Sequence, residues 1–105
     1  MLVPAACNDA AGSHLALTPP SSGCEIYVKE EYKQFTGSFK ERGARNALMQ
    51  LDEKQKVKGV IAASAGNHAL ALSYHGGLMG IPVTVIMPTT APLVKVNRCA
   101  RNPCP

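Results

Sequence analysis

Two short runs hold the residues that could carry out chemistry. Residues 35–44 read FTGSFKERGA and contain a lysine, Lys40, while residues 64–68 read SAGNH. A neutral lysine amine can attack a carbonyl carbon and form a Schiff base. Hydroxyl, amide and backbone N–H groups at the start of a helix are typical of a site that holds an anion. Together the two runs predict covalent carbonyl chemistry beside an anion site.

The lysine is expected in the first turn of a helix. Ser38 and Glu41 have the spacing of a capping box, so the helix is predicted to start with Ser38 as its N-cap. The positive end of the helix dipole disfavours an ammonium at Lys40, and partial burial would act in the same direction. A structural or solvent-exposed role is the alternative for this lysine. The buried face of the helix is predicted to hold four residues at helical spacing: Ala44, Ala47, Leu48 and Leu51.

The second run lies between an expected strand and an expected helix, the place where α/β sheets bind ligands. Gly66 permits close approach of a ligand to the backbone, and Ser64 and Asn67 offer side-chain hydrogen bonds. Ordinary N-capping by Ser64 or Asn67 is the alternative to anion binding. His68 is expected to be packed or hydrogen-bonded and not to act as a base.

The elements around these runs predict an α/β fold. Strands are expected over 26–31, 59–64 and 82–88, a helix over 67–79 ended by Gly80, and a polar connection over 52–58. Strand, helix and strand in this order form a βαβ unit with parallel strands. A further helix could open at 95–99 and cannot continue through Pro103. Two strands with one covering helix leave an apolar face uncovered, which suggests a fragment.

Composition limits the other classes of function. The chain has 105 residues, 46% of them hydrophobic, and a net charge of +4. No membrane span or secretory signal is evident, and the scattered basic residues lack a nucleic-acid signature, although a small basic binding module is a weak third reading. Cys7, Cys24, Cys99 and Cys104 are expected as free thiols in the cytoplasm, without a metal site. His14 and His75 are expected at the surface.

Residues 34–44 and 63–69 closely resemble the serine/threonine dehydratase family of fold-type II pyridoxal phosphate (PLP) enzymes. That family includes threonine ammonia-lyase and serine racemase, and the resemblance runs from about residue 27 to residue 97. It implies a tryptophan-synthase-β-like architecture, here partial. Residues 25–52 would be a strand–helix piece of the large domain and 53–97 the start of the small α/β domain. Residues 1–24 would be a flexible extension and 98–105 an atypical tail.

The resemblance also implies roles for single residues. Lys40 would bind PLP as a Schiff base and take the substrate's Cα proton, Phe39 would pack beside the cofactor, and Asn67 would bond the ring's phenolic oxygen. The substrate carboxylate would be held by the turn Ser64, Ala65, Gly66, Asn67 and His68. The implied reaction is β-elimination from L-threonine or L-serine, which gives a 2-oxo acid and ammonia. Racemases of the family carry a second serine where this chain has Ala65, so elimination is favoured.

Two departures from the family pattern leave an alternative open. The glycine-rich loop that grips the PLP phosphate is absent, as is the hydroxyl residue that faces the pyridine nitrogen. A catalytically inactive truncated form, which acts if at all through protein contacts, is therefore the second hypothesis. A homo-oligomer is possible for a full-length enzyme of this family.

Overall fold

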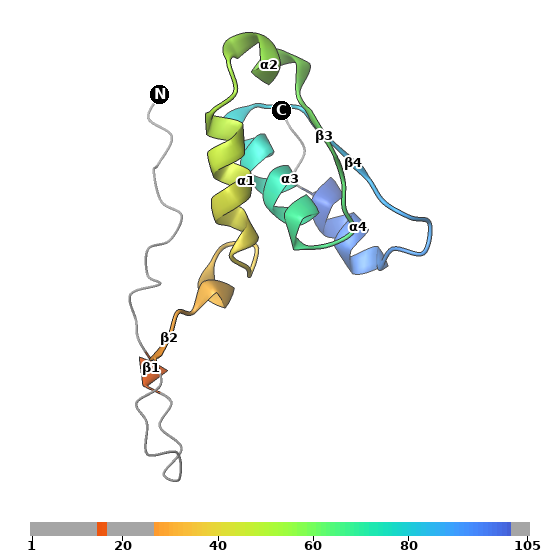
Figure 1. Cartoon of the computed structure of the whole chain (residues 1–105). Helices are drawn as coiled ribbons and strands as arrows, with labels where there is room; N and C mark the ends of the chain where they lie inside the picture. The colour runs from red at the N-terminus through yellow and green to blue at the C-terminus, as the bar shows by residue number, and fades with distance from the viewer. Residues whose placement is uncertain (1–14, 17–26, 102–105) are drawn as a thin grey trace.

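The computed structural model describes residues 15–16 and 27–101. Its elements are β1 (Leu15–Ala16), β2 (Tyr27–Val28), the 3-10 helix η2 (Glu31–Lys33), α1 (Lys40–Met49), α2 (Glu53–Lys58), β3 (Val60–Ala63), α3 (Asn67–Met79), β4 (Val83–Ile86) and α4 (Leu93–Ala100). Strands β1 and β2 pair antiparallel, apart from the rest of the fold in Figure 1. The predicted strand over 26–31 is therefore shorter, because Glu31 already belongs to η2. Strand β1 lies within the predicted extension 1–24, whose other residues are outside the described part.

The core forms where α1 packs against α3, and the two helices lie side by side in Figure 1. It is built from fully buried apolar residues of both helices and of the connection after α3: Ala44, Leu48, Ala71, Leu72 and Ile81. The prediction for α1 was right for Ala44 and Leu48 and wrong for Ala47, which is exposed. The buried face of α1 turns instead toward Glu41 and Arg45, both of which are buried. Helix α1 thus places polar side chains in the interior.

The βαβ unit is confirmed. Strands β3 and β4 pair in parallel with Val60 beside Val83 and Ala63 beside Ile86, and α3 connects them. Gly80 ends α3 in the left-handed conformation with φ 66°, as predicted. Helix α4 follows the second strand and packs on α3, so the helix expected near 95–99 is also present.

One face of the two-stranded sheet is bare. Along both strands, half-buried residues alternate with exposed ones, and the exposed set includes Ile61 at 73% and Ile86 at 59%. The continuous apolar run 59–64 predicted a strand buried on both faces. No described element covers the outer face, so burial is one-sided, as expected for two strands with a single covering helix.

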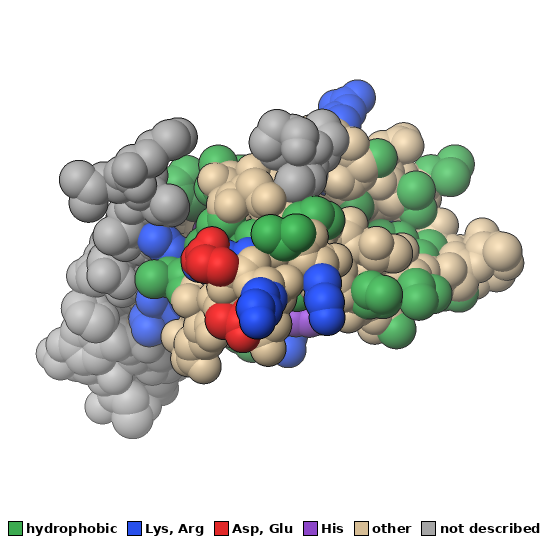
Figure 2. All heavy atoms as spheres, turned by 90° about the horizontal axis from the view of Figure 1, so that it is seen from above, with side chains coloured by type: hydrophobic (Ala, Val, Ile, Leu, Met, Phe, Trp, Pro, Cys, Tyr) green, Lys and Arg blue, Asp and Glu red, His purple; other side chains and the backbone are tan. Residues whose placement is uncertain are grey.

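The sequence 52–58 forms a helix that was not predicted. Asp52 caps α2, accepting the N–H of Gln55 at 2.7 Å, while the Gln55 side chain accepts the N–H of Asp52 at 2.9 Å. Seen from above in Figure 2, acidic and basic side chains gather over this helix. Asp52 and Gln55 thus form a capping box at the start of α2. The box predicted for Ser38 and Glu41 is not formed at the start of α1.

The described helices are all too short to cross a bilayer. Residues 15–16 and 27–101 also contain no group of three or more His, Cys, Asp or Glu side chains that could hold a metal ion. Cys99, the cysteine within the described residues, is a half-buried free thiol.

Candidate active site

The turn that leads into α1 is set by Gly37 and Ser38. Gly37 has φ +80°, a backbone conformation that disfavours any residue with a Cβ. The Ser38 hydroxyl then accepts the backbone N–H of Lys40 at 3.1 Å. Ser38 is not the N-cap that was predicted, because the helix begins one residue later and Phe39 occupies the cap position. Lys40 is consequently the first residue of the helix.

The side chain of Lys40 points outward. The residue is exposed, and its Nζ lies 5.4 Å from the centroid of the Phe39 ring, which is itself 60% exposed. The prediction that Lys40 is partly buried, which would have favoured a neutral amine, is therefore wrong. The amine instead stands beside an open aromatic face, within the range of a cation–π contact.

Residues next to Lys40 anchor this end of the helix. Glu41 is fully buried and accepts the backbone N–H of Thr36, so it reaches back across the turn and does not bond Ser38 as predicted. Arg42 Nε contacts both carboxylate oxygens of Glu31 at 3.0 and 3.1 Å, which holds η2 against α1. The Arg42 guanidinium lowers the pKa of the Glu31 carboxyl below its ordinary value. The exposed lysine is thus carried by a firmly held first turn.

The second turn, 64–67, joins β3 to α3. The Ser64 backbone N–H donates to Ile86 O at 3.0 Å and so continues the strand ladder, while the Ser64 hydroxyl accepts the N–H of Gly66 at 3.3 Å. Gly66 is the N-cap of α3, and a Cβ added to it would meet nothing within 4 Å. No described neighbour requires a glycine here, and the missing side chain leaves space for a ligand beside the backbone. Ala65 beside it is half-buried.

Asn67 is exposed and makes a long-range contact with α4. Its Oδ1 accepts a hydrogen bond from Lys95 Nζ at 2.9 Å. An ammonium can only donate, so the amide oxygen faces Lys95 and the amide NH₂ is left as a donor. Neither Ser64 nor Asn67 supplies a side-chain N-cap to α3, because the cap is Gly66 without a side-chain bond. His68 is exposed, so the expected packing of this residue is wrong.

The structure brings the two runs onto two packed helices. Lys40 opens α1 and Asn67 opens α3, and these helices share the core. The side chains of Lys40 and Asn67 point to different described partners, Phe39 and Lys95, so no direct bond joins them. The expectation that His75 lies at the surface is wrong, because this residue of α3 is only 3% exposed.

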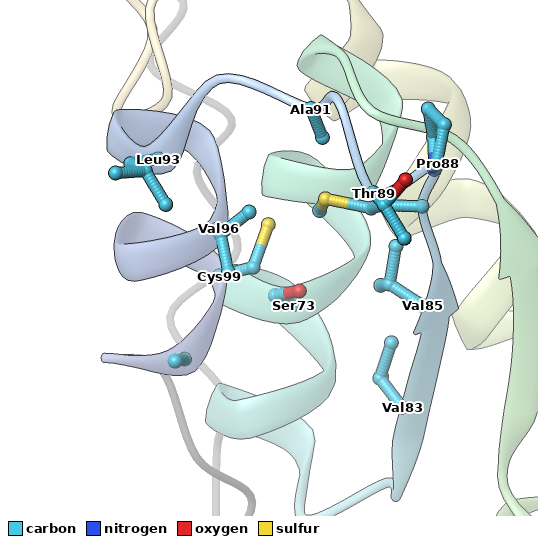
Figure 3. A pocket seen from close by; sticks show the side chains of 11 residues that line it. Ser73, Val83, Val85, Pro88, Thr89, Ala91, Leu93, Val96 and Cys99 are labelled. Carbon is cyan, nitrogen blue, oxygen red and sulfur yellow. The ribbon is translucent and has the colours of Figure 1, made fainter.

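Two cavities are lined by the described residues. The larger, of about 570 Å³, lies between α3, β4 and α4, with Cys99, Val96 and Val85 on its wall (Figure 3). The smaller, of about 290 Å³, has Phe35, Thr36 and Tyr74 on its wall. Neither is lined by Lys40 or by a residue of the 64–68 turn. The candidate chemistry is therefore carried by the exposed turns and not by either of these two cavities.

A family model described as "Pyridoxal-phosphate dependent enzyme" matches residues 14–102. The chain therefore belongs to this family, as its resemblance to the serine/threonine dehydratases predicted. It is 53% identical over 72 residues to the catabolic L-threonine dehydratase of Staphylococcus aureus strain N315, a match that covers 69% of this chain and 21% of that protein. The chain thus spans about a fifth of the length of this curated relative.

Two solved structures share the fold. A processed threonine deaminase isoform of Solanum lycopersicum matches with a TM-score of 0.73 and 40% identity, over 76% of this chain and 23% of that one. The serine racemase of Dictyostelium discoideum matches with a TM-score of 0.74 and 46% identity, over 76% of this chain and 26% of that one. These likenesses confirm the predicted fold class, an α/β chain with part of the fold-type II architecture.

The residues of the two turns fit the aldehyde and ring of PLP. An exposed primary amine stands beside an exposed aromatic ring at the start of α1. At the start of α3, the amide NH₂ of Asn67 can donate to a phenolate oxygen, because its oxygen already binds Lys95. The open space at Gly66 leaves room for a planar ligand close to the backbone. This donor set matches a carbonyl compound that carries an anionic oxygen.

Proposed function

We propose that this chain carries the lysine half of a PLP-dependent serine/threonine ammonia-lyase site, with Lys40 as the covalent cofactor lysine. The observation that carries the proposal is the position of Lys40: an exposed amine at the first residue of a helix whose next residue, Glu41, is buried and bonded to Thr36, and whose Arg42 binds Glu31. A lysine held only for solubility has no need of such an anchored turn. Its placement on a helix packed against the Asn67 helix supports a shared site.

Each residue of the site has one task in this proposal. The Lys40 amine would hold PLP at its aldehyde carbon and would take the Cα proton of the substrate. Phe39 packs beside the ring, Asn67 donates its amide N–H to the phenolic oxygen, and the backbone N–H groups near Gly66 hold the substrate carboxylate. When bound, PLP supplies the electron sink that stabilises negative charge at Cα.

Ala65 supports elimination over racemisation. A racemase needs a second proton donor and acceptor on the opposite face of the substrate, and an alanine methyl group cannot move a proton. The proposed substrates are therefore L-threonine and L-serine, and the proposed products are a 2-oxo acid and ammonia. A homo-oligomer and the cytoplasm remain predictions for the whole protein.

The experiment that tests the lysine uses the 105-residue chain mixed with PLP. We expect a yellow absorbance band that disappears in Lys40→Ala and persists in Lys58→Ala, a matched exposed lysine on α2. A band of equal strength in both variants would contradict the role of Lys40.

A second measurement tests the reaction. The chain loaded with PLP is incubated with L-threonine, and both the 2-oxo acid and the D-amino acid are assayed. Formation of 2-oxo acid that depends on Lys40 supports the lyase. If Lys40 forms an adduct with PLP but no product appears, Lys40 remains the cofactor lysine and lyase activity of these residues is contradicted. If a D-amino acid is the main product, the role given to Ala65 is contradicted.

A further inference from the structure

Glu41 and His75 meet in the interior between α1 and α3. Glu41 is 0% exposed and His75 is 3% exposed. Glu41 Oε2 and His75 Nε2 lie 3.7 Å apart, and neither atom has a hydrogen-bond partner among the described residues. The other carboxylate oxygen, Oε1, accepts the Thr36 N–H. Two buried polar atoms without partners therefore face each other across the helix interface.

Leaving two such atoms unbonded is unfavourable, since a buried polar group without a partner has lost its hydrogen bonds to water and gained none in return. A hydrogen bond between them needs a donor–acceptor distance of about 3.0 Å, so closing less than an ångström satisfies both atoms. The neutral imidazole can do this if its proton is on Nε2, because a carboxylate accepts and cannot donate.

The surroundings of His75 favour a neutral imidazole. Arg45, one helical turn after Glu41, is also buried, and Tyr74 lies edge-on to the His75 ring at 5.1 Å. Burial lowers the pKa of His75 below its ordinary value of 6.5, and the positive charge of Arg45 acts in the same direction, whereas Glu41 opposes both. Burial and the nearby arginine charge therefore both favour the uncharged form of His75.

We propose that Glu41 and His75 are positioning residues: the His75 Nε2–H donates to Glu41 Oε2 and fixes the first turn of α1, and with it Lys40, against α3. Glu41 is the next residue after Lys40 and bonds both the preceding turn, through Thr36, and the neighbouring helix. The positioning role rests on the proposed function of Lys40, because it matters only if this lysine reacts with PLP. The hydrogen bond itself stands on the burial and geometry of the pair.

Nitrogen NMR of the His75 ring tests the bond without any cofactor. In the wild-type chain at pH 7.5 we expect the Nε2–H tautomer. In Glu41→Gln the side-chain oxygen is still required by the Thr36 N–H, so the amide NH₂ must face His75. The ring should then switch to the Nδ1–H tautomer, with Nε2 as an acceptor. The exposed Glu53→Gln serves as the control and should leave the tautomer unchanged.

An Nδ1–H tautomer in the wild-type chain, or no switch in Glu41→Gln, would overturn the bond. Positioning is tested by the rate at which PLP forms its adduct with Lys40. Glu41→Gln should react at close to the wild-type rate, and Glu41→Met should be slower by about tenfold or more, since it leaves Thr36 N–H and His75 unbonded. An unchanged rate in a folded Glu41→Met would overturn positioning.

The two proposals fail in different ways. If the wild-type chain forms no adduct at Lys40, the proposed function fails while the tautomer switch still decides the Glu41–His75 bond. If Glu41→Met does not fold, the tautomer of Glu41→Gln and its rate decide the proposal, because a rate tenfold below wild type in this isosteric variant would contradict it.

Discussion

The interface between α1 and α3 and the outer face of the β3–β4 sheet are opposites in packing. At the interface, Leu48, Ala71 and Glu41 are each no more than 1% exposed. On the outer face of the sheet, Ile61 and Ile86 are each more than half exposed, although their side chains are as large and apolar as that of Leu48. The chain therefore completes its packing around the helix that carries Lys40 and leaves its sheet open.

The difference shows which part of the fold depends on this chain alone. Side chains at the helix interface are buried by described neighbours, so truncating one of them should lower the stability of this chain. Side chains on the bare face gain nothing from described neighbours, so their burial would require a further layer.

Leu48→Ala should have the largest effect, a loss of about 2–5 kcal/mol in the free energy of unfolding, because it leaves a cavity in the core. Ile61→Ala removes a similar volume from the bare face and should cost less than about 0.5 kcal/mol. Chemical denaturation of the two variants measures the contrast. Equal losses would mean that the sheet face is packed in solution.

Gly76→Ala is expected to destabilise the chain by about 1–3 kcal/mol, since an added Cβ would lie 2.2 Å from Val83 Cγ2 and 3.1 Å from Ile81 O. Gly43 is the control within α1, where a Cβ meets nothing within 4 Å. Gly43→Ala should stabilise the chain by up to about 1 kcal/mol, because alanine favours a helix. Thermal unfolding of both variants would reveal opposite shifts, and shifts of the same sign would contradict the close packing of α3 on β4.

His75 should make stability depend on pH. Its pKa is lowered in the folded state, mainly by burial, so below its ordinary value of 6.5 the unfolded chain binds a proton that the folded chain does not. Stability should therefore be fully present above pH 6.5 and fall as the pH drops from 6.5 toward the folded pKa. His75→Asn should flatten the slope in this window, as measured by denaturation at several pH values. If the free energy of unfolding changes with pH as steeply in His75→Asn as in the wild type, His75 is not the cause of the dependence.

Ile86→Lys should have the smallest effect on unfolding, within about 0.5 kcal/mol of wild type, because the side chain already faces solvent. The same change should reduce any self-association through the bare face, since it places a charge on an apolar surface. Sedimentation at several concentrations measures this. A large loss of stability would show that the face is covered.

The regular elements were the predictable part of the fold. The apolar runs and Gly80 fixed α3, β3 and β4 nearly to the residue, because periodicity and breakers act locally. Helix α2 was missed because five of the seven residues in 52–58 are charged and the segment has no apolar face. Its cap, Asp52 with Gln55, was the signal that could have revealed it.

The site was predictable in its residues and not in its packing. Lys40 and Asn67 could be singled out because each opens a helix within a recognisable run. The burial of Glu41 and His75 depends on how α1 turns against α3, and no local pattern specifies that rotation. Glu41 was given to a capping box because its spacing from Ser38 fits one, whereas in the fold its carboxylate bonds Thr36 and faces the buried imidazole.

The most direct test of the central claim is to find which lysine PLP modifies. The 105-residue chain is incubated with PLP, reduced with borohydride, digested, and its peptides are mapped by mass spectrometry. Of the seven lysines in the sequence, we predict that Lys40 carries the reduced adduct. Modification spread over exposed lysines such as Lys54 and Lys58, with no preference for Lys40, would contradict the account.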